Sequence, residues 1–336
     1  MRNQANTGNA AFVFLLLFLM SIAGSASSSV ASAFPLQIPI EGRALGMGGL
    51  GCALITDFGE MGSNPGNLIL HRGVSVTVAP KLGSINQLVP DLADDIYYGY
   101  TSLRVSAPDL SFVRPHIWIL RRYLDYGERT SFPGGIRHEI ERTEAVGLGL
   151  TLFNQLGIGY VEKNIQLEIM DQKPRGRAID YGVTWMPKTK LISGDLLLGL
   201  SWLNIGDAIG SFNSESDGPL PRYFRYGFSY QGAKPTQGPG GPWIWTVGLE
   251  STELQVPGGH RTSQMGFEFR GEMLAFRGGY IHDPDGDVTD FTFGVGIVQK
   301  VFDLLAFRLD IANHPQASEL DRTWKGSISF QLHPQG

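Results

Sequence analysis

The sequence predicts an all-β protein: a transmembrane antiparallel β-barrel of about 14 strands, with an N-terminal segment inside the lumen. The first observation is alternation, because in Ala145–Phe153 (AVGLGLTLF) apolar residues point one way while glycines and Thr151 point the other. The second is composition, with 44 glycines and 18% charged residues, where soluble domains have ~25%. The third is that no later apolar run approaches ~18 residues, so strands must cross the membrane.

The N-terminus, residues 1–33, is predicted to be a signal peptide. Arg2 precedes a charge-free apolar run, Ala10 to Ala23, which is shorter than the ~20 residues of a membrane helix. The small residues of Ala31-Ser32-Ala33 fit a cleavage site before Phe34. We therefore expect export, with an uncleaved N-terminal anchor as the alternative, and for a barrel the destination is the outer membrane of a Gram-negative-type envelope.

Residues 34–70 are predicted to form a hatch or plug segment. They are rich in glycine, lack period-2 alternation and turn at Asn64-Pro65-Gly66. A barrel of about 14 strands encloses a lumen too wide for its own side chains to fill, and glycines let a backbone approach its wall closely. The alternative is an ordinary extension that precedes the barrel. The candidate hatch and gating residues are Gly46, Gly48, Gly49, Asp57, Asn64 and Pro65.

Residues 71–333 are predicted to supply the barrel as runs of about ten residues, the length of a tilted membrane strand. The alternative is a large soluble sandwich, because alternation alone does not separate lipid from a protein core. The fourteen runs, bounded by turn clusters, are Val74–Leu82, Ile96–Ser106, Leu110–Tyr126, Glu144–Phe153, Leu156–Lys163, Ala178–Met186, Leu196–Ile205, Tyr223–Gln231, Trp243–Glu250, Gln264–Gly271, Leu274–Ile281, Thr289–Gln299, Leu304–Ala312 and Trp324–Leu332.

Charged residues within these runs fall mainly on the phase opposite the apolar side chains. In Phe291–Val298, for example, Phe293 and Val295 are predicted to face lipid, and Thr292 and Gly294 the interior. We expect lumenal ion pairs that hold hatch and wall together, with substrate gating as the alternative role. The candidate lumenal polar residues are Arg225, Glu250, Glu268, Arg270, Arg308 and Asp310, and Arg277 shares their phase.

No pattern predicts a catalytic residue, a metal or a cofactor. Asp283, Asp285 and Asp287 alternate, but the glycine and glutamate positions of an EF-hand do not match. The seven histidines include no HExxH motif, and no spacing singles out a serine and histidine for a barrel hydrolase. A net charge of −5 argues against nucleic acid as a partner, and the single Cys52 excludes an intrachain disulfide framework.

A family resemblance rests on the order of several motifs. Gly42–Gly49 (GRALGMGG), followed by Asp57 and Ser63–Leu68 (SNPGNL), resembles the opening of the PorV/PorQ-type outer-membrane proteins, a branch of the FadL-like transporter superfamily. Gly66 departs from the pattern, since the family usually has Ala there. Later segments such as Leu196–Gly206 and Phe307–Leu332 follow the family's order. The resemblance implies a 14-stranded barrel whose N-terminal segment folds into the lumen as a hatch.

Two functions are compatible with this resemblance. The first is a component of type IX protein secretion that binds exported protein cargo or other envelope proteins at the outer membrane. The second is a FadL-like transporter of hydrophobic small molecules. The resemblance favours the first, although the sequence has no cargo-binding signature. Outer-membrane lipid is an expected partner in either case.

Overall fold

The computed structural model describes residues 36, 41–56, 58, 63–82, 84–89, 93–131, 135–168, 173–188, 194–207, 209, 219–234, 242–285, 288–301, 304–316 and 322–332. The predicted signal peptide and Asp57 lie outside these residues. Within this part of the chain, no helix has the length and apolar character needed to span a membrane.

The described chain is built almost entirely from strands. One short helix, α2 (Gly42–Gly46), precedes them. The strands are β1 (Val74–Ala79), β2 (Gln87–Val89), β3 (Ala93–Ser106), β4 (Val113–Ser131), β5 (Gly135–Leu152), β6 (Leu156–Glu168), β7 (Arg175–Trp185), β8 (Asp195–Gly206), β9 (Tyr223–Lys234), β10 (Trp243–Leu254), β11 (Arg261–Arg270), β12 (Leu274–Asp283), β13 (Val288–Val301), β14 (Leu305–His314) and β15 (Thr323–Leu332).

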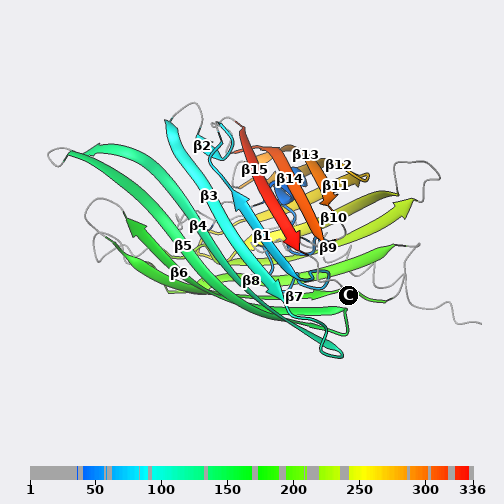
Figure 1. The fold of residues 1–336 in the computed structure, drawn as a ribbon. Coiled ribbons are helices and arrows are strands. Elements are labelled where there is room, and N and C mark those ends of the chain that lie inside the picture. The colour runs from blue at the N-terminus through cyan, green and yellow to red at the C-terminus, as the bar shows by residue number, and fades with distance from the viewer. Residues whose placement is uncertain are drawn as a thin grey trace, which may run out of the picture.

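All strands except β2 close into one antiparallel barrel of fourteen strands (Figure 1). Closure occurs at β1, which pairs with β15 on one side and with β3 on the other. The short β2 pairs only with the first residues of β3. Each remaining strand pairs with its neighbours in sequence, as expected for a chain of hairpins. The predicted all-β antiparallel barrel of about 14 strands is confirmed.

The β4–β5 hairpin is longer than the sequence predicts. β4 has 19 residues and β5 has 18, and their pairing passes a register shift between Asp125 and Glu128. Pairing to β3 ends at Asp125 and pairing to β6 begins at Ile140, so the hairpin continues beyond both neighbours as a two-stranded ribbon. The predicted runs stopped short here because the polar sequence from 127 to 143 lacks the alternation that a lipid-facing strand requires.

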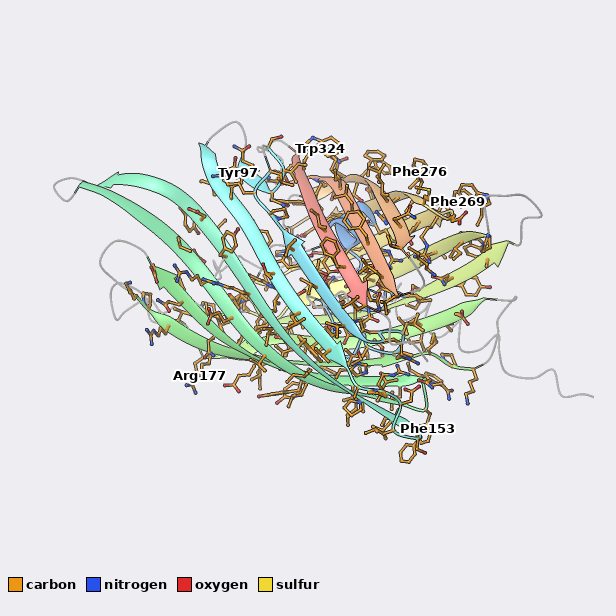
Figure 2. All side chains as sticks on the ribbon, viewed as in Figure 1. Tyr97, Phe153, Arg177, Phe269, Phe276 and Trp324 are labelled. Carbon is orange, nitrogen blue, oxygen red and sulfur yellow. The ribbon has the colours of Figure 1, made fainter. Side chains whose placement is uncertain are left out.

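Burial alternates along the strands and places the apolar phase outside. On β5, Val146, Leu148 and Leu150 are exposed on the outer surface, and Figure 2 shows Phe276 and Trp324 projecting from the outside of the wall. On β13 the predicted orientation is confirmed. A closed barrel with an apolar outer face and a polar inner face is an outer-membrane barrel, and the protein lies in the outer membrane.

Candidate functional site

A segment before the first strand lines the inside of the barrel, and we call its described residues, 41–56, 58 and 63–71, the belt. Every residue from 41 to 56 is buried. The helix α2 contacts β12, β13, β14 and β15 and lies within the barrel in Figure 1. Later belt residues reach β8 and β9 through Cys52 and Ala53, then β6 and β7 through Pro65 and Gly66. The belt therefore follows the inner wall across most of its strands.

An ion-pair network fixes the beginning of the belt. Arg43 of α2 donates to Glu268 of β11 through Nε and Nη2, at 2.9 and 2.8 Å. The same carboxylate accepts from Arg277 Nε at 2.7 Å, and Arg277 Nη1 lies 2.8 Å from Asp310 Oδ1. Arg308 pairs with the other oxygen of Asp310. These five side chains are at most 4% exposed, so each buried charge is paired, as a low-dielectric interior requires.

Glu250 of β10 binds the belt through its main chain. One carboxylate oxygen accepts from the backbone N–H groups of Gly51 and Cys52, both at 2.8 Å. The other accepts from Arg225 Nε of β9 at 2.6 Å, and Arg225 Nη2 donates to the carbonyl of Gly49 at 3.0 Å. The predicted pair of Arg225 and Glu250 thus binds the backbone of three belt residues, Gly49, Gly51 and Cys52.

The Cys52 thiol lies in the middle of these contacts. It is fully buried, and its Sγ contacts the Ser201 hydroxyl at 3.7 Å. A thiol without access to solvent is unreactive, so Cys52 serves packing.

The predicted Asn-Pro turn ties the two halves of the belt together. Asn64 Nδ2 donates to the carbonyl of Cys52 at 2.7 Å, and its Oδ1 accepts from the N–H of Gly66 at 2.8 Å. Asn67 Nδ2 reaches back to the carbonyl of Leu54 at 2.8 Å. Because these bonds satisfy buried backbone groups, the belt keeps a fixed path without regular secondary structure.

Glycines in the wall create the room that the belt occupies. A Cβ placed on Gly279 of β12 would lie 2.1 Å from the Gly48 nitrogen, and one on Gly159 of β6 would lie 2.0 Å from the Pro65 carbonyl oxygen. Any side chain there would collide with belt backbone. Wall glycines with such contacts to belt backbone are Gly157, Gly159, Gly182, Gly199, Gly266, Gly279 and Gly294, and Gly149 and Gly248 leave room for the belt side chains of Leu68 and Leu50.

The predicted belt glycines meet these walls closely. Gly48 and Gly49 adopt left-handed backbone, with φ of 76° and 81°, which favours glycine. The Gly48 N–H donates to Thr292 Oγ1 at 2.9 Å, and Gly46 packs on Gly294. The predicted hatch residues thus form two groups along the belt: Gly46, Gly48 and Gly49 lie against β11–β13, and Asn64 and Pro65 lie against β6 and β7.

Among the predicted lumenal residues, Arg270 differs from the other five. It is the last residue of β11, lies opposite Ala275 of β12 and is half-buried, whereas Arg225, Glu250, Glu268, Arg308 and Asp310 contact the belt or its ion-pair network. The sequence analysis missed Arg43, and the signal for it was a lone cation within an otherwise apolar and glycine-rich segment. The wall glycines lie on the polar phase of the alternating sequence, but the sequence does not indicate that they make room for the belt.

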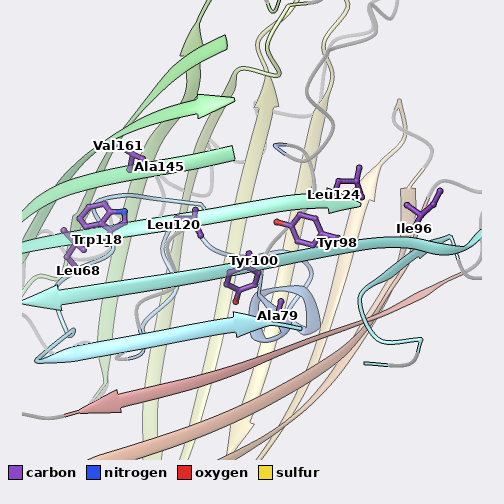
Figure 3. Packing of buried hydrophobic residues seen from close by; sticks show 10 residues of the cluster. All are labelled: Leu68, Ala79, Ile96, Tyr98, Tyr100, Trp118, Leu120, Leu124, Ala145 and Val161. Carbon is purple, nitrogen blue, oxygen red and sulfur yellow. The ribbon is translucent and has the colours of Figure 1, made fainter. Parts of the chain in front are cut away.

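The inner wall also carries an apolar surface. Tyr98 and Tyr100 of β3 and Trp118, Leu120 and Leu124 of β4 are buried and point inward, where they form one cluster with Leu68 of the belt (Figure 3). Ala145 of β5 and Val161 of β6 extend it. A water-filled pore has a polar interior. This part of the lumen is apolar instead and is suited to contact with apolar molecules.

Buried histidines fasten the end of the belt. Ser106 Oγ lies 2.5 Å from His71 Nδ1 and 2.6 Å from His116 Nδ1, and His116 Nε2 lies 2.9 Å from Thr151 Oγ1. Ser106 is 7% exposed, and both histidines are less so. The hydrogen bonds through Ser106 hold His71 against β3 and β4. Because these side chains are buried, a substrate cannot reach them as a hydrolase would require.

In the acidic segment around Asp283, which the sequence analysis compared with a calcium loop, the Asp283 carboxylate contacts protein side chains. Asp283 Oδ2 accepts from Thr262 Oγ1 at 2.9 Å and lies 3.2 Å from His260 Nε2. Asp287 is outside the described residues. Within the described part of the chain, no three His, Cys, Asp or Glu side chains gather as metal ligands.

Comparison with known proteins gives structural neighbours only. No protein-family model matches the sequence, and no curated protein matches it. The Ralstonia pickettii toluene transporter TbuX shares 13% identity over 90% of this chain and 100% of its own, with a TM-score of 0.49. The Pseudomonas putida toluene transporter TodX shares 12% identity over 86% of this chain and 96% of its own, with a TM-score of 0.47. Acinetobacter baumannii CdiB shares 10% identity over 77% of this chain and 59% of its own, with a TM-score of 0.44. Likeness at this level carries no argument about function.

Proposed function

We propose that this outer-membrane barrel transports hydrophobic small molecules, and that the belt is the hatch that keeps its lumen closed to water. The observation that carries the proposal is the inward-facing apolar cluster on β3–β6, which lies directly against Leu68 of the belt. Ligand sites are mostly apolar with a few placed polar groups. The buried hydroxyls of Tyr98 and Tyr100 supply such polar groups in this cluster.

The belt has the properties that a displaceable hatch needs. Its contacts with the wall are hydrogen bonds, ion pairs and close packing on glycine, and it contributes no strand to the barrel ladder. The wall carries its own charge balance beneath the belt, because Arg277 pairs with Glu268 and Arg225 pairs with Glu250 within the strands. A barrel that retains these pairs remains intact when the belt moves.

The secretion role that the resemblance implies is the weaker candidate. Cargo binding calls for an outward-facing surface specific for protein, and the described residues offer no feature that distinguishes such a surface from an ordinary barrel rim. The apolar lumenal cluster has no purpose in that role. We therefore place small-molecule transport first.

Binding of an apolar fluorophore tests the proposal. We would titrate the purified protein with 1-aminoanthracene and compare Leu120→Ala with Ile119→Ala. Leu120 faces the lumenal cluster, whereas its neighbour Ile119 is 51% exposed on the outer face. Loss of about two methylenes from a ligand contact corresponds to about 1.5 kcal/mol, or roughly tenfold in Kd.

The expected result is saturable binding that weakens about tenfold in Leu120→Ala and is unchanged in Ile119→Ala. Equal behaviour of the two variants would assign the signal to the micelle or the outer surface. Absence of saturable binding to the unmodified protein would also count against the transport of hydrophobic molecules.

A further inference from the structure

The outer face of the barrel has a depression that the fold does not require. On β12, Gly278 points outward between Phe276 and Tyr280, and a Cβ added there would have no atom within 4 Å. Its neighbour Gly279 faces the belt and has no room for a Cβ. A larger apolar residue at Gly278 would favour the strand and suit lipid contact, so the packing of the barrel gives no reason for glycine.

Aromatic side chains surround this position without covering it. Phe267 of β11 and Phe293 of β13 are the direct cross-strand neighbours of Gly278, and they are 45% and 59% exposed. Aromatic residues often stabilise a strand glycine by folding their rings over it. The empty space around Gly278 excludes that arrangement and leaves a slot between the two rings.

The slot belongs to a longer groove that crosses five strands. One cross-strand row borders it on one side and consists of Phe228, Leu249, Met265, Tyr280 and Phe291. The opposite row contains Val247, Phe267, Gly278 and Phe293. The groove has a cavity volume of about 550 Å³, and these residues line it. This volume is within the ~300–1,000 Å³ of ligand sites.

The length and the surroundings of the groove fit an acyl chain. Strands of such barrels tilt by ~35–45° from the membrane normal, so a groove perpendicular to them inclines by roughly 45–55°. With strands ~4.8 Å apart, five strands give it a length of about 19 Å. The outer face lies in the hydrocarbon region of the membrane, where water is absent. The groove is therefore expected to be filled by a lipid acyl chain.

We propose that the groove centred on Gly278 is a binding site for one acyl chain of a membrane phospholipid. The rings of Phe267 and Phe293 form its sides, and the backbone at Gly278 forms its floor. This site is on the outer face, and it is independent of the belt and of transport through the lumen.

Native mass spectrometry of the purified barrel, after a graded detergent wash and addition of dioleoyl phosphatidylglycerol, tests the site. The unmodified protein is expected to retain one phospholipid, and Gly278→Leu, which fills the slot, to lose at least 80% of that retention. Phe293→Ala removes a side of the slot and should also lower retention. Val295→Leu alters the next outward residue of β13, which does not line the groove, and should retain lipid normally.

Equal retention by all four proteins would overturn the proposal, since ordinary annular lipid behaves in that way. So would a dimer of the unmodified protein that Gly278→Leu converts to monomer, because the occupant would then be a second copy of the chain. Retention of lipid A but not of phospholipid would likewise contradict it.

Discussion

The inner and outer faces of the barrel wall differ most clearly at two adjacent residues of β12. Gly279 faces inward, where belt backbone fills the space that a side chain would take, while Gly278 faces outward into open space. The same contrast holds for the charges. Inward-facing Glu268 and Asp310 are buried within ion pairs, whereas the outward phase at the same level is apolar. The inner face is therefore shaped by contact with the belt, and the outer face, apart from the groove at Gly278, by contact with lipid in general.

Removal of a buried charge should affect the inner face most. Glu268→Gln leaves Arg43 and Arg277 buried without their shared carboxylate and is expected to cost about 3–5 kcal/mol of unfolding free energy. Glu144→Gln is the matched control, because Glu144 and Arg121 form an exposed pair at 3.8 Å whose loss costs below ~1 kcal/mol. Reversible urea titrations in lipid would measure both, and similar losses would contradict the distinction.

The two glycines of β12 allow a comparison at neighbouring positions. Gly279→Val would push on the belt at Gly48 and should cost about 1–3 kcal/mol, as overpacking does. Gly278→Val places the same side chain in open space, and its effect should be within ~0.5 kcal/mol. The same titrations apply here. If Gly278→Val were the more destabilising variant, the inner face would not be the close-packed one.

A smaller effect is expected at the rim, outside the strands. His260 precedes β11, and its hydrogen bond to Asp283 raises the pKa of the imidazole, with burial acting in the opposite direction. The pair therefore stabilises the fold below the ordinary histidine pKa of ~6.5, and this contribution is lost as the pH rises through the raised folded pKa. Between pH 5.5 and 8.5 the parent should lose about 0.5 kcal/mol more than His260→Gln. Identical pH profiles would exclude this contribution.

The outer face could be predicted from the sequence, because contact with lipid requires an apolar residue at every second position of a strand. The alternating runs identified each of the fourteen barrel strands, with errors at the ends of β4 and β5 among the largest. They also assigned Phe293 and Val295 to the outside and Thr292 to the inside, where they lie at 59%, 51% and 0% exposure. Strand ends beyond the hydrocarbon, as in β4 and β5, carry no such signal.

The inner face could be predicted only in outline. The polar phase identified Glu250, Glu268, Arg308 and Asp310, but it could not say which charges pair, since pairing depends on register across several strands. It also assigned Thr292 to the interior but did not indicate what Thr292 contacts there. In the structure, Thr292 Oγ1 accepts from the Gly48 N–H of the belt at 2.9 Å, so the belt occupies the space beside it.

The conductance of a barrel without its belt tests the central claim most directly. Deletion of residues 42–68 removes most of the belt and leaves the wall pairs of Glu268 with Arg277 and of Glu250 with Arg225 in place, so the barrel should still fold. In planar bilayers the account predicts stable open channels for the deleted protein and little conductance for the parent. A deleted protein that folds, as judged by its heat-dependent gel mobility, and conducts no more than the parent would contradict the claim that the belt closes the lumen.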